Sequence, residues 1–156
     1  MPTAETNGSN SYQVRRVPRF DRSYDALIKK HYRRNKKAKQ EFEQIVKDFI
    51  KEVEDISCLD KISDLEPFPS KTAEAGFEFR KKRWRRLPGL EGSARFCRLI
   101  FLVCHAKKRL YLIWIYTHAE FSEPNSRPPD KDLRDEISFI KQERFNEAEG
   151  ESFNSS

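Results

Sequence analysis

Residues 95–103 read Arg-Phe-Cys-Arg-Leu-Ile-Phe-Leu-Val, and residues 110–118 read Leu-Tyr-Leu-Ile-Trp-Ile-Tyr-Thr-His. A short turn at Ala106-Lys107-Lys108 separates the two segments, so they predict an antiparallel pair of strands. The first segment is apolar on both faces, which is typical of a central strand covered by helices. Residues 77–86, Phe-Glu-Phe-Arg-Lys-Lys-Arg-Trp-Arg-Arg, precede them and complete a predicted three-stranded antiparallel sheet.

Two helical patterns lie upstream of this sheet. Apolar side chains recur at helical spacing over residues 20–32 and again over about residues 37–56. A break at residues 33–35 predicts that the two helices form an antiparallel hairpin. With a short strand at residues 12–18 before them, the predicted fold class is α+β: an N-terminal strand, an antiparallel helical hairpin, a three-stranded antiparallel sheet and an extra C-terminal helix.

The rest of the chain divides by composition. The predicted segments are a disordered leader at 1–11, an irregular connection at 59–76, a proline-rich loop at 122–129, a helix at about 130–143 and a disordered tail at 144–156. At 156 residues the chain fits one domain, which we predict over residues 12–143.

The longest apolar runs have strand length, so no membrane segment is expected. An odd count of three cysteines and no signal-peptide pattern favour the cytoplasm.

Charge is unevenly distributed. The net charge is +6, and residues 76–98 hold eight Lys or Arg against two acids, which favours nucleic acid as the partner. Residues 132–151 reverse the sign, with seven acids against three bases. The acidic C-terminal helix could therefore fold over the basic face as a mask, and deleting residues 128–156 would then raise RNA affinity. A second basic run at residues 29–39 could also hold backbone phosphates.

The register of the strand pair decides which side chains share a face. A three-residue turn pairs His105 with Arg109 and puts Arg98 opposite Tyr116, whereas a two-residue turn puts them on opposite faces. With the longer turn, one face carries Phe96, Arg98, Trp114, Tyr116 and His118.

This face can support phosphate chemistry. Arg98 can hold a phosphate with its guanidinium fork, and His118 can transfer a proton near neutral pH. Tyr116 is a second candidate, as a proton donor or a stacking ring. The preceding strand and the loop after it supply the predicted RNA contacts, which are Arg80, Lys82, Arg83, Trp84, Arg86 and Arg95. Alternation sends Arg80, Lys82, Trp84 and Arg86 to one side of the strand and Lys81, Arg83 and Arg85 to the other, and only one side can meet RNA.

Other chemistries lack their sequence patterns. No Cys or His pair has the spacing of zinc ligands, and the five glycines form no phosphate-binding loop. We therefore expect no metal and no cofactor.

The order of the elements resembles the RelE/ParE superfamily of bacterial toxins over about residues 12–121. The motif Arg98-Leu99-Ile100-Phe101 is similar to the phosphate-holding central strand of the ribosome-dependent RelE-like members. The ending Ile115-Tyr-Thr-His-Ala-Glu120 is similar to their last strand. The resemblance implies a type II toxin-antitoxin system, in which the toxin inhibits translation by cleaving mRNA on the ribosome as an mRNA interferase. It also implies metal-independent 2′-hydroxyl attack and a cognate antitoxin that masks the basic surface.

Three functions follow as expectations. The first is the RelE-like endoribonuclease, with Arg98, His118 and Tyr116 in its site. The second is a ParE-like inhibitor of DNA gyrase, which breaks no bond. The third is a toxin-like RNA-binding protein without turnover. The leader, the segment at 59–76 and the C-terminal helix depart from the usual family pattern. The endoribonuclease hypothesis requires Arg98, His118 and at least one base from residues 82–86 to converge within about one phosphate diameter in an open concavity.

Overall fold

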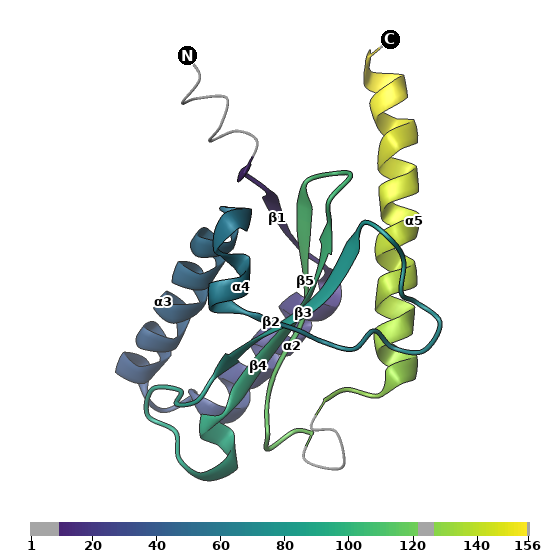
Figure 1. Cartoon of the computed structure of the whole chain (residues 1–156). Helices are drawn as coiled ribbons and strands as arrows, with labels where there is room; N and C mark the ends of the chain where they lie inside the picture. Colours follow the sequence, from purple (N-terminus) through teal and green to yellow (C-terminus); the bar gives the residue numbers. More distant parts are fainter. Residues whose placement is uncertain (1–9, 122–126, 156) are drawn as a thin grey trace.

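The computed structural model of the chain describes residues 10–121 and 127–155, with side chains in the last helix described as far as Gln142. These residues form an α+β fold, as predicted. The strands are β1 (Gln13–Arg16), β2 (Asp64–Leu65), β3 (Phe77–Trp84), β4 (Cys97–Cys104) and β5 (Arg109–Thr117). The helices are α2 (Pro18–His31), α3 (Lys36–Val53), α4 (Leu59–Ile62) and α5 (Asp130–Ser155). Figure 1 shows the sheet between α3 on one side and α5 on the other.

The sheet is larger than the sequence predicted. Its order is β1-β5-β4-β3-β2, and the three predicted strands β3, β4 and β5 are antiparallel neighbours at its centre. The N-terminal strand β1 joins the sheet by pairing parallel to β5. At the other edge, β2 pairs with β3. Strand β2 lies inside the segment at residues 59–76, which was predicted to be irregular. Two residues are too few to show strand alternation, so the sequence pattern could not reveal β2.

The register between β4 and β5 puts Arg98 opposite Tyr116, but by a different route from the prediction. Cys104, not His105, pairs with Arg109, because the turn has one more residue than predicted. A register shift between Ile100 and Phe101 leaves Ile113 as an extra residue of β5. The two one-residue differences cancel, so the site end of the hairpin has the predicted pairing.

The helical hairpin covers one face of the sheet. Asn35 caps α3 by accepting a hydrogen bond from the Ala38 amide at 3.0 Å, which fixes the break between the helices. Phe42 of α3 then stacks against Tyr24 and Tyr32 at centroid distances of 5.6 and 5.1 Å. Further along α3, Phe49 meets the edge of Phe101 in β4. The hairpin and the central strand therefore share one core.

The C-terminal helix covers the opposite face through apolar side chains. Leu133, Ile137 and Ile140 are almost fully buried, while Glu136 forms an ion pair with Arg19 at 3.2 Å. The part of the helix that carries these three residues therefore belongs to the core. It continues past the predicted end near residue 143 to Ser155. Residues 1–9 of the predicted leader and 122–126 of the predicted loop lie outside the described residues.

The described helices include no candidate for a membrane-spanning segment. None of the helices within residues 10–121 and 127–155 combines the length and apolar character that a bilayer span requires.

Candidate functional site

A cleft lies where β3 and β5 end and β4 begins. These ends meet because each strand runs antiparallel to its neighbour. The cleft has a volume of about 320 Å³. Its lining residues are Arg83, Trp84, Arg85, Phe96, Cys97, Arg98 and His118. The structure therefore places Arg98 and His118 in the lining of one cleft with two bases from residues 82–86.

His118 is held by the residue that leads into β4. Its backbone amide donates to the Phe96 carbonyl at 3.0 Å, and its ring stacks on the Phe96 ring at a centroid distance of 5.3 Å. The Arg95 guanidinium lies 4.5 Å from the centre of the same Phe96 ring. Two contacts therefore fix the imidazole at the cleft, and Arg95 supports the ring beneath it.

The surroundings of His118 favour its neutral form. Burial lowers the pKa of His118 below its ordinary value, and the positive charges of Arg98 and Lys81 lower it further. A neutral imidazole can accept a proton at neutral pH, so His118 has the protonation state of a general base.

Tyr116 lies on the same face but does not line the cleft. Its side chain is 1% exposed, and its ring meets the edge of Phe121 at 5.3 Å. Burial raises the pKa of Tyr116 well above its usual range, against the opposing effect of Arg98. Tyr116 therefore packs behind Arg98, and burial keeps it from the substrate contact that the sequence suggested.

The predicted cationic strand divides between two environments. Arg83 is half exposed and pairs with Asp64 at 2.9 Å, whereas the Lys82 ammonium lies 5.6 Å from the Phe49 ring and 5.5 Å from the Trp84 ring on the α3 side. Arg86 is exposed and lines a second hollow with the loop that follows β3. Arg85, which was not among the predicted RNA contacts, is exposed and lines the cleft. Strand alternation puts Arg85 on the same side as Arg83, and both residues line the cleft.

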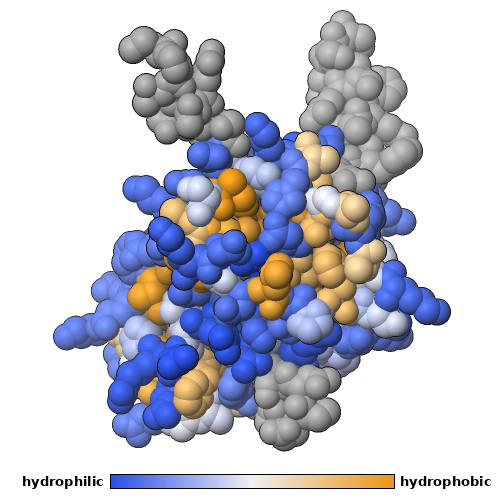
Figure 2. Space-filling model, viewed as in Figure 1, coloured by the Kyte–Doolittle hydropathy of each residue, from blue (hydrophilic) through white to orange (hydrophobic). Residues whose placement is uncertain are grey.

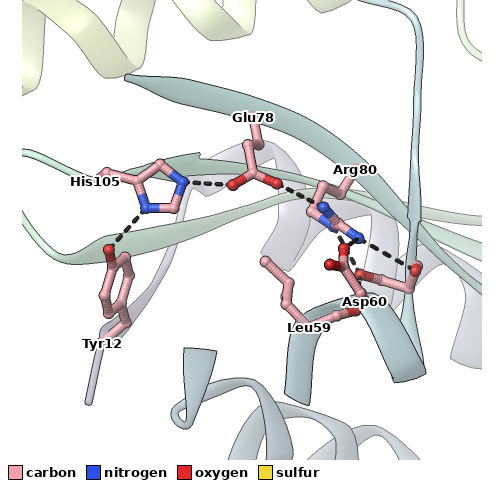
Figure 3. A network of polar contacts seen from close by, with 7 residues as sticks. Tyr12, Leu59, Asp60, Glu78, Arg80 and His105 are labelled. Carbon is pink, nitrogen blue, oxygen red and sulfur yellow. Dashed lines mark hydrogen bonds and ion pairs between the residues drawn. The ribbon is translucent and has the colours of Figure 1, made fainter. Parts of the chain in front are cut away.

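Arg80 belongs to a polar network and not to the cleft (Figure 3). Its guanidinium donates to Glu78 at 2.5 Å, to Asp60 at 2.8 Å and to the Ser63 hydroxyl at 2.9 Å. The other Glu78 oxygen lies 2.5 Å from His105 Nε2. The Arg80 side chain is only 3% exposed. A buried guanidinium with these partners cannot meet RNA, so the predicted role of Arg80 as a phosphate contact does not fit the structure.

The same network fixes the N-terminal segment to the sheet. The Tyr12 hydroxyl lies 2.7 Å from His105 Nδ1, and burial raises the pKa of Tyr12. The two ring nitrogens of His105 therefore contact the Tyr12 hydroxyl on one side and the Glu78 carboxylate on the other. The chain of contacts thus joins the start of β1, the β4–β5 turn, β3 and α4.

Replacing Arg80 by alanine should therefore reduce stability. We expect a loss of about 3 kcal/mol in the free energy of unfolding, because Glu78 and Ser63 lose their buried partner. Urea denaturation followed by tryptophan fluorescence measures this. Arg86→Ala removes an exposed cation from the same segment and should cost at most about 0.5 kcal/mol. If Arg80→Ala instead left stability intact and weakened RNA binding, the structural role would be wrong.

The described residues offer no ready metal site. No three His, Cys, Asp or Glu side chains within residues 10–121 and 127–142 gather closely enough to hold an ion.

Comparison of the chain with protein-family models, curated proteins and solved structures returned no match. Function must therefore be inferred from the chain's own geometry.

Proposed function

We propose that this chain is a RelE-like toxin, an endoribonuclease that cleaves mRNA on the ribosome through metal-independent attack of a 2′-hydroxyl. The observation that carries the proposal is the meeting of Arg98 and His118 in one cleft with Arg83 and Arg85. A cation and a neutral imidazole are the two groups that this reaction needs, one for the phosphate and one for the proton.

The residues divide the work by their chemistry. His118 accepts the proton of a ribose 2′-hydroxyl, and the oxygen attacks the adjacent phosphorus. As the new P–O2′ bond forms, the P–O5′ bond breaks, which leaves a 2′,3′-cyclic phosphate and a 5′-oxygen that takes a proton from water. Arg98 stabilises the charge that gathers on the phosphorane.

Two further groups would bind the RNA around the reacting phosphate. Within the described part of the chain, Arg83 forms a half-exposed ion pair with Asp64, and such a pair contributes little stability, so a phosphate can replace the carboxylate. Arg85 is exposed and lines the same cleft, so it can meet a neighbouring phosphate. The Trp84 ring packs against Phe49 and the Lys82 ammonium on the α3 side, so it is not proposed as a stacking platform. A polyanionic substrate matches this lining better than a small neutral molecule does.

The partners follow from the same proposal. The ribosome would present the mRNA, a cognate antitoxin would cover the cationic surface, and both would meet the chain in the cytoplasm. No helix in the described residues suits a membrane span, so no membrane partner is proposed.

The test is induction of the full chain in a bacterial host, with primer extension on a reporter mRNA. We expect new 5′ ends within translated codons and growth arrest, and both should disappear in Arg98→Ala. Lys47→Ala removes an exposed cation from α3 and should behave as the wild type. Growth arrest with intact mRNA would replace the nuclease with a ParE-like gyrase inhibitor. RNA binding without cleavage or arrest would indicate a toxin-like protein that has lost turnover.

A further inference from the structure

We infer that the turn between α2 and α3 is a second RNA-binding surface that holds the backbone beyond the cleft. The inference rests on the proposed RNA substrate. We name this surface the cationic corner. It consists of Lys29, Lys30, Arg33, Arg34, Lys36 and Lys37, all of which are exposed.

The charges of the cationic corner are almost uncompensated. Within the described part of the chain, the six side chains make one ion pair, between Lys30 and Glu120 at 4.0 Å. Some cations elsewhere are paired at short range, such as Lys81 with Glu66 at 2.8 Å and Arg127 with Asp130 at 2.8 Å. Six neighbouring positive charges with one long ion pair among them repel one another, so they favour a polyanion as the partner.

The corner is attached to the loop that carries part of the cleft. The Tyr32 hydroxyl donates to the Pro88 carbonyl at 2.8 Å. Gly89 has a φ of 68°, and a Cβ at this position would lie 2.9 Å from the Ala38 Cβ. Only glycine allows this close approach. Arg85 and Phe96, which line the cleft, lie at the two ends of the same loop. The cleft and the cationic corner therefore occupy one end of the molecule and are held in a fixed relation.

A second attachment joins the corner to the end of β5. The Glu120 carboxylate lies 3.6 Å from His31 Nε2 and accepts a hydrogen bond from the Thr117 hydroxyl. His118 and Ala119 lie between Thr117 and Glu120 in the sequence. Figure 1 shows the start of α3 beside the loop that follows β3, and Figure 2 shows mainly hydrophilic residues over that lower-left part of the view.

This arrangement predicts what the substrate must be. An RNA with one phosphate in the cleft would have its neighbouring phosphates against the cationic corner. A long strand should therefore bind more tightly than a short one. The contacts would be to phosphates, which carry no sequence information. The corner would therefore add affinity and strand length dependence without base preference.

The experiment compares two RNA lengths and two variants that lose the same charge. The corner variant carries Arg33→Gln, Arg34→Gln, Lys36→Gln and Lys37→Gln. The matched control carries Lys47→Gln, Lys51→Gln, Lys61→Gln and Lys131→Gln, which are exposed positions outside the corner and the cleft lining. Binding of a fluorescent single strand of about 20 nucleotides and of a trinucleotide is measured by anisotropy from about 50 to 200 mM salt.

Each phosphate contact on a single strand contributes about 0.7 to the slope of log K against log salt. We expect the corner variant to lower that slope by about 2 to 3 for the long strand and to weaken its binding at least about tenfold, while trinucleotide binding stays as in the control. Equal slopes for the corner variant and the control would overturn the inference alone. A wild type that binds neither RNA would overturn the proposed function itself.

Discussion

Replacing His118 by alanine is expected to lower RNA cleavage about 100-fold to 10,000-fold, the usual contribution of a positioned general base. RNA affinity should change little, because Arg83, Arg85 and Arg98 remain in the cleft. Single-turnover cleavage on purified ribosomes, with RNA binding measured on the same samples, separates the two effects. His118→Gln keeps a similar size without the base and should be as inactive as the alanine variant. Equal losses of binding and cleavage would instead make His118 a phosphate contact.

If His118 is the general base, the direction in which cleavage changes with pH can be predicted. His118 acts as a base only when neutral, so cleavage should fall as the pH drops through its pKa. Burial, Arg98 and Lys81 lower that pKa, so the acid limb should lie below about 6.5, the value for an unperturbed histidine. Lys81→Gln removes one of the nearby charges and should move the limb to higher pH. A titration of the imidazole signals by NMR checks the same shift directly. If the pH at which cleavage falls did not follow the pKa of His118 measured by NMR, the base would be another group.

Removing residues 130–156 is expected to unfold the protein. The deletion exposes the sheet face beneath Leu133, Ile137 and Ile140, which are at most 1% exposed. Burying such side chains contributes about 1.5 to 3 kcal/mol each, so the three together approach the whole stability of a typical domain. Circular dichroism and tryptophan fluorescence of the truncated chain measure the loss.

Single substitutions on α5 separate this core role from masking. Ile137→Ala should cost about 2 to 5 kcal/mol in the free energy of unfolding. Phe139 lies two residues away and is 43% exposed, so Phe139→Ala should cost clearly less than the loss at position 137. RNA affinity should be unchanged in both folded variants. A truncated chain that stayed folded and bound RNA more tightly would restore the masking hypothesis.

The two arginines inside strands show why the candidate site could be predicted only in part. Arg80 and Arg98 both interrupt strand patterns, and the sequence suggested phosphate contacts for both. Asp60 and Ser63 bind Arg80, but they belong to a segment that was predicted to be irregular. No local pattern could report that these partners lie against β3. Arg98 lines the open cleft, so the same residue type has two different roles.

Sequence alone determined the three central strands and the helical hairpin. These features depend on apolar periodicity along short segments, which residue order records directly. Tertiary structure decided the extra residue at Ile113, the edge strand β2, the burial of Tyr116 and Arg80, and the packing of α5. Each of these depends on contacts between segments distant in the chain, where hydrogen-bond partners and excluded volume select one arrangement among several that the local pattern allows.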